Sequence, residues 1–289
     1  MRHAICIALC LLSAPALAQT CPPAGWDEAS LQALKASKFV LSDAAERRKL
    51  ADGLLACLGD PDPELRDGIA YDALAQWLRA GDFDAAALRS QRDRLYAMLD
   101  GNDVQGFRGP FAALVLSEVA RTDRIQPWMT PEERAAMVER AAAYLESIDD
   151  YRGYDATEGW RHGVAHGADW LMQLALNPAL DRAQLERILA AVAVQAVPVD
   201  GPAYVFGEPA RLAQPVLHAA RRGLLSESDW QAWFAALSAR LGKRGDGQLA
   251  WLARMHNLKA FLTHLYVETD RSDDVQVRAL KPVVAGALK

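Results

Sequence analysis

The feature that most constrains this fold is a series of helix-start signals spaced along the chain. Thr130 is followed by Pro131 and then by Glu133, the threonine-to-glutamate spacing of a capping box. Aspartate takes the capping position at Asp181 and at Asp62. Behind such starts, apolar residues recur every three or four positions, and the alternation typical of strands is scarce. The sequence therefore predicts an all-α protein.

The expected helices are joined by short turns, which favours antiparallel neighbours. The stretch Asp62–Leu78 resembles the second half of a HEAT-type repeat, and helix pairs recur at roughly 40-residue intervals. Two architectures stay open: an irregular array of helical hairpins, HEAT-like, and a compact α/α bundle. No low-complexity linker divides residues 19–289, so we expect them to form a single all-helical domain. Val197–Phe206 combines Pro, Gly and β-type residues and is expected to be a loop or a short extended piece.

The chain opens in the manner of a secretory signal peptide. Arg2 lies in a short basic start, Ala4–Leu12 is apolar, and Ala16-Leu17-Ala18 has the small residues of a cleavage site. The apolar run is shorter than the roughly 20 residues that a membrane-spanning helix needs. We therefore expect residues 1–18 to be a signal peptide that is cleaved after Ala18. The mature chain would be periplasmic or secreted, with no integral membrane segment.

Two of the four cysteines, Cys21 and Cys57, follow the expected cleavage site. An even pair of cysteines in an oxidising compartment predicts a disulfide. The alternative is a pair of buried free thiols.

The charge pattern bears on the class of partner. The formal net charge is −5, and both signs are interspersed along the chain. Because binding to nucleic acid needs a basic stripe that neutralises phosphates, nucleic acid is not an expected partner.

Candidate site residues concentrate in one central stretch, YRGYDATEGWRHGVAHGADW. We expect a helix that has Thr157 as its N-cap and runs to about Leu176. In such a helix His162, His166 and Asp169 lie on one face, because residues three and four apart are neighbours.

Three glycines, Gly159, Gly163 and Gly167, form a ladder beside this face. Glycine weakens a helix by about 1 kcal/mol per position. The ladder therefore indicates that another backbone or a ligand comes very close.

Three interpretations of the polar face stay open. In the first, it is simply the solvent side of an amphipathic helix. In the second, His162, His166 and Asp169 bind a divalent metal. The glutamate that follows the first histidine in helical metalloproteases is replaced here by Gly163. In the third, the two histidines form a pocket for an organic or anionic ligand, or an acid–base site, without metal and together with Asp169, Arg152 and Trp160.

Three short motifs then carry a family resemblance: Arg152-Gly153-Tyr154, Gly159-Trp160-x-His162 and Ala165-His166-Gly167-Ala168-Asp169. They resemble a bacterial family catalogued as domain of unknown function 2785. Weaker matches are Arg108, Glu208, Arg211 and Asn257-Leu258-Lys259. The family name implies no activity, substrate, cofactor or catalytic residue.

Two classes of function follow from the residues. The first is a binding protein with a polar cleft for a small polar molecule, a peptide or a glycan fragment. Its predicted ligand-binding residues are Arg152, Tyr154, Trp160, His162, His166, Asp169, Glu208 and Arg211. The second is a secreted or periplasmic hydrolase, either metal-assisted or using His and Asp as acid and base. In both cases Arg152, the two histidines and Asp169 are expected to share one cleft, with Glu208 or Arg211 approaching from the next helical pair.

Overall fold

The structure is a computed structural model that describes residues 20–245 and 248–289. Its elements are α1 Glu28–Ala36, α2 Ala44–Leu54, η1 Leu55–Gly59, η2 Glu64–Tyr71, α3 Asp72–Ala80, α4 Ala85–Leu99, α5 Arg108–Ile125, α6 Pro131–Glu146, β1 Tyr154–Asp155, β2 Gly159–Trp160, α7 Gly163–Ala175, α8 Arg182–Ala196, α9 Glu208–Arg221, α10 Glu227–Ala239, α11 Gln248–Arg271, α12 Val275–Ala279 and α13 Lys281–Ala287. The all-α prediction is confirmed. The expected signal peptide, with its cleavage site at Ala18, lies outside the described residues.

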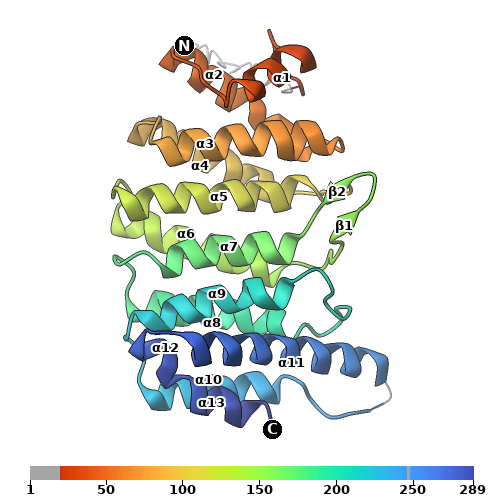
Figure 1. Cartoon of the computed structure of the whole chain (residues 1–289), viewed down its shortest axis with the longest axis vertical. Coiled ribbons are helices and arrows are strands. Elements are labelled where there is room, and N and C mark those ends of the chain that lie inside the picture. Colours follow the sequence, from red (N-terminus) through yellow and green to blue (C-terminus); the bar gives the residue numbers. More distant parts are fainter. Residues whose placement is uncertain (1–19, 246–247) are drawn as a thin grey trace, which may run out of the picture.

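The helices alternate between two layers (Figure 1). In one layer α3, α5, α7, α9 and α11 lie side by side, and each packs against the next. Behind them lie α4, α6, α8 and α10, and α6 packs against α8. Successive hairpins therefore stack along the long axis as an irregular array, and not as a compact bundle. None of the described helices is both long and apolar enough to span a membrane.

Local caps begin several helices where the sequence predicts them. The Thr130 hydroxyl accepts the N–H of Glu133 at 3.2 Å, and the Glu133 carboxylate accepts the N–H of Thr130 at 2.8 Å. Asp181 opens α8 with the same kind of reciprocal pair. Asp62 accepts the N–H of Glu64 at 2.8 Å, but the turns that follow, η2, are wound as a wide π-helix before α3 continues.

The expected loop Val197–Phe206 contains no helix or strand. Asn257 of α11 binds this loop through two hydrogen bonds. Its side-chain oxygen accepts the N–H of Tyr204 at 2.7 Å, and its side-chain nitrogen donates to Pro202 O at 2.9 Å. Both ends of this buried amide are therefore satisfied. The loop is fixed on α11, and it carries Phe206 to the start of α9.

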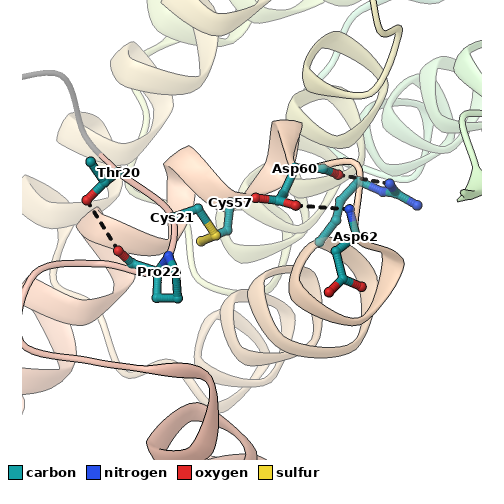
Figure 2. Close-up of a disulfide and its surroundings, with 7 residues drawn as sticks. Thr20, Cys21, Pro22, Cys57, Asp60 and Asp62 are labelled. Atoms are coloured by element: carbon teal, nitrogen blue, oxygen red, sulfur yellow. Dashed lines mark hydrogen bonds between the residues drawn. A yellow bond between two sulfur atoms is a disulfide. The ribbon is translucent and has the colours of Figure 1, made fainter.

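The predicted disulfide between Cys21 and Cys57 is present (Figure 2). It joins the segment before α1 to η1, across a sequence separation of 36 residues. Cys57 is fully buried, and Cys21 packs partly buried against the same core. The bridge therefore fastens the amino-terminal segment to the first helices of the array.

Replacing Cys21 with serine should lower the free energy of unfolding by roughly 3–4 kcal/mol, because an open loop of this length regains entropy on unfolding. Urea denaturation of the two proteins measures the difference. Adding reductant should lower the wild-type midpoint to that of the variant and leave the variant unchanged. Equal midpoints without reductant would contradict the prediction.

Candidate functional site

The central site is built on a short hairpin that projects from the side of the array, about midway along its length and beside the ends of α5 and α7 (Figure 1). Strands β1 and β2 pair antiparallel, with Tyr154 opposite Trp160. One further backbone bond, from Arg161 N–H to Gly153 O at 2.9 Å, continues the ladder toward α7. Tyr154 and Trp160 therefore lie side by side on the same face of the hairpin.

The helix expected from Thr157 begins instead at Gly163, so that prediction was wrong. The Asp155 carboxylate accepts the N–H groups of Thr157 at 2.8 Å and Glu158 at 2.9 Å, which closes a turn between the strands. His162 has a φ of 55° and occupies the left-handed region directly before α7. This conformation is uncommon outside glycine and separates the extended hairpin from the helix.

Two buried arginines, one distant in sequence and one directly after β2, hold the hairpin in its extended form. Arg66, fully buried in η2, donates from Nη2 to Glu158 O at 2.7 Å. Arg161 donates to the Glu158 carboxylate at 2.7 Å and to Gln105 O at 2.7 Å. Both guanidinium groups lie 4.1 Å from the centre of the Phe107 ring. These contacts hold the turn of the hairpin against η2 and the start of α5.

Side chains, and not another backbone, are the protein groups that lie closest to the glycine ladder. A Cβ added at Gly159 would lie 3.0 Å from Nη2 of Arg66. One added at Gly163 would lie 3.4 Å from the Tyr144 hydroxyl, and one at Gly167 would lie 3.1 Å from the Tyr144 ring. The two helical glycines therefore allow α7 to pack tightly against α6.

Three exposed aromatic residues form what we call the ring shelf: Tyr154, Trp160 and Phe206. Their exposed fractions are 53%, 36% and 36%. The Trp160 ring lies 5.1 Å from Tyr154 and meets Phe206 edge-on at 6.0 Å. A Cβ on Gly153 would lie only 2.0 Å from the Phe206 ring, so that ring rests directly on the hairpin backbone. Beneath Trp160, His162 stacks at 4.7 Å.

The rings of two uncharged histidines lie between the ring shelf and the core. His162 and His166 lie 5.9 Å apart, and His166 meets Phe111 at 5.2 Å. Burial, with the nearby Arg211 charge, lowers the pKa of His162 to about 4. Burial, with His162 and Arg211, lowers the pKa of His166 to about 3. Both imidazoles are therefore neutral at pH 7.

The tautomer of His166 follows from its partner. Nδ1 lies 3.1 Å from Pro110 O, which can only accept a hydrogen bond. The proton is therefore on Nδ1, and Nε2 carries the lone pair.

The structure brings some of the predicted site residues together and separates others. Arg211 approaches from α9 as expected, but it binds Asp169: Nε donates at 2.7 Å, and Nη2 bonds the second carboxylate oxygen. Arg152 instead binds Asp150, with Nε 2.8 Å from the carboxylate. Arg152 therefore does not join the two histidines, whereas Arg211 lies near enough to influence both.

The predicted metal set of His162, His166 and Asp169 is not assembled. Across residues 20–245 and 248–289, no three His, Cys, Asp or Glu side chains are grouped so that they could hold a metal ion. The reason is visible in their partners, because Asp169 is paired with Arg211 and His166 uses Nδ1 on Pro110 O.

Phe206 and the two anchoring arginines were not predicted from the sequence. Phe206 carries one usable signal, since it stands two residues before Glu208, a predicted site residue. The structure gives Glu208 a supporting role: its buried carboxylate accepts the N–H of Phe206 at 2.9 Å. Burial raises the pKa of Glu208. Arg66 carries no local signal, because its partner Glu158 O is distant in sequence. Arg161 has a near partner in Glu158, but its second partner, Gln105 O, is distant as well.

Comparison with known proteins places the whole region in a family. Residues 95–267, which include the hairpin and α5 to α9, match the profile of the family described as Protein of unknown function (DUF2785). Neither the curated proteins nor the solved structures contain a significant match. Because the profile covers more than half of the chain, this protein belongs to the DUF2785 family.

Proposed function

We propose that this protein is a binding protein and that its ligand rests on the ring shelf. The observation that carries the proposal is the shared exposure of Tyr154 and Trp160, on a hairpin whose turn is fastened by buried arginines, and of Phe206, whose ring rests on that hairpin. Exposed apolar surface costs free energy, so rigidly held rings that face solvent are typical of contact sites. Preorganised rings also lose little conformational entropy on binding.

The ring shelf favours a glycan fragment over a peptide or a small anion. A pyranose ring has an apolar C–H face that stacks on aromatic rings and a hydroxyl edge that bonds polar neighbours. Asp155, the exposed residue next to Tyr154 in sequence, is such a neighbour, and its negative charge opposes an anion. Arg211 could attract an anion, but it is already paired with Asp169.

The proposal includes export. The bond between Cys21 and Cys57 supports a periplasmic or secreted location, because disulfides persist in oxidising compartments.

Replacing Trp160 with alanine should weaken glycan binding by about tenfold, because it removes the central ring of the shelf. Isothermal titration with chitotriose, cellotriose and maltotriose measures the effect. Gly153→Ala should also weaken binding, since its Cβ displaces the Phe206 ring. Trp251→Ala on α11 is the matched control and should bind as the wild type does. Unchanged affinity in Trp160→Ala would exclude the ring shelf, and no binding of any trisaccharide would exclude the glycan proposal.

A second candidate, acid–base hydrolysis, rests on the tautomer of His166. Its Nε2 lone pair is the arrangement of a general base whose other nitrogen is anchored. Its pKa of about 3 makes it a weak base at neutral pH, and Asp169 bonds neither histidine among the described residues. Mass spectrometry of the same trisaccharides after incubation distinguishes the two functions, because a hydrolase shortens them and a His166→Gln variant would not.

A further inference from the structure

A cavity lies at the opposite end of α5 from the ring shelf. It has a volume of about 630 Å³ and is formed by the end of α3, the start of α4 and the carboxyl end of α5. The eighteen residues of α5 separate it from the hairpin by roughly 27 Å, at 1.5 Å per residue. Its size lies in the range of pockets that take small organic molecules, roughly 300–1,000 Å³.

The inner wall of this cavity is apolar. Phe83 and Leu88 line it and are almost fully buried, and Ile125 at its mouth is 60% exposed. Trp128 completes the wall, and its indole N–H is already satisfied by the Thr122 hydroxyl at 2.9 Å. Trp128 therefore presents its apolar ring, and not its indole N–H, to a bound molecule. The cavity suits an apolar chain or ring and leaves part of Ile125 uncovered without one.

The polar part of the cavity carries one uncommitted positive charge. Asp84 is held by Arg48 at 2.8 Å and caps α4, and Arg79 is paired with the buried Glu118. Arg121 lines the same cavity, and it forms no hydrogen bond or ion pair with any residue that the structure describes.

Two further arginines near Arg121 add to the positive charge at the cavity. Arg124, one turn further along α5, has a lowered pKa, first because of its own burial and then because of the Arg121 charge. Arg79, with a side chain 55% exposed, contributes a second guanidinium to the lining. A planar guanidinium with free donors matches a carboxylate, which can accept two parallel hydrogen bonds.

We propose that this cavity is a second ligand site, which binds a free carboxylate with an apolar tail. The carboxylate pairs with Arg121, and the tail lies along Phe83, Leu88 and Trp128. The site is independent of the ring shelf, so each can be tested while the other is intact.

Octanoate and 1-octanol have the same number of carbon atoms in an unbranched chain and differ chiefly in the charge of the head group. Isothermal titration of the full chain should give saturable one-site binding of octanoate, with 1-octanol at least about tenfold weaker because it lacks the charge-assisted bond. Arg121→Gln should weaken octanoate binding by about tenfold and leave 1-octanol unchanged. Ile125→Glu, which sets a carboxylate at the mouth, should abolish octanoate binding.

Arg278→Gln is the matched control, since it removes one exposed arginine on α12 and should bind octanoate as the wild type does. Thermal denaturation confirms that each variant is folded. Equal binding of octanoate by the wild type and Arg121→Gln, or equal binding of octanoate and 1-octanol, would overturn the proposal. Absence of octanoate binding to the wild type would overturn it as well.

Discussion

Replacing Arg66 with methionine is expected to lower the free energy of unfolding by about 3–5 kcal/mol. The guanidinium has no solvent exposure and donates to Asp60 O at 2.9 Å and Glu158 O at 2.7 Å. It also pairs with Asp67 at 2.7 Å and lies over the Phe107 ring. Methionine fills a similar volume but leaves these carbonyls without a donor, and an unsatisfied buried group costs about 1–3 kcal/mol.

Urea denaturation measures the change in the Arg66→Met variant. Amide exchange of the hairpin provides a second readout, because release of Glu158 O should speed exchange at Arg161. Arg48→Met is the matched control: that arginine is half exposed, and its surface pair with Asp84 should contribute nothing measurable. If Arg66→Met lowers the free energy of unfolding as little as Arg48→Met does, the buried network does not support the hairpin.

The second large effect is expected at Asp123, where replacement with alanine should cost about 3–5 kcal/mol. This fully buried carboxylate accepts four hydrogen bonds. Oδ1 accepts the N–H groups of Trp128 at 2.9 Å and Met129 at 2.7 Å, and Oδ2 accepts from Arg134 at 2.7 Å and Asn177 at 2.9 Å. One side chain thereby joins α5, the connection to α6, α6 itself and the turn after α7.

An Asp123→Asn variant separates charge from shape in this joint. The amide keeps the volume but turns one acceptor into a donor that faces other donors, so most of the loss should remain. Both variants are measured by urea denaturation. Asp273→Asn, an exposed aspartate near α12, is the control and should have the stability of the wild type. An Asp123→Asn variant as stable as the control would contradict the role of the four bonds.

The sequence predicts those parts of the fold that depend on neighbouring residues. The capping box of Thr130 and Glu133 spans three residues, and its geometry follows from residue type alone. The apolar periodicity predicts all-α packing for the same reason. The disulfide was predictable from two cysteines in a segment expected to be exported. The choice of the array over the bundle depends on which helix packs against which, and no local pattern records that.

The local shape of the candidate site could not be predicted from the sequence. The helix expected from Thr157 was a sound inference from capping chemistry, yet the Arg66 bond to Glu158 O crosses 92 residues of chain. A hydrogen bond of that separation leaves no periodic trace. Asp169 was expected beside the histidines because of its helical spacing, but its carboxylate binds Arg211 of the neighbouring helix α9. The contacts of these side chains therefore depend on residues that are distant in sequence.

The stacking of hairpins has a consequence for how the molecule opens. Because each helical hairpin contacts chiefly the hairpins beside it in the stack, local unfolding is expected to spread inward from the two ends, and not to occur everywhere at once. The disulfide between Cys21 and Cys57 restrains the first helices of the stack covalently. Fraying should therefore begin at the α10–α13 end, with α7 in the middle of the stack among the last helices to exchange its amide protons.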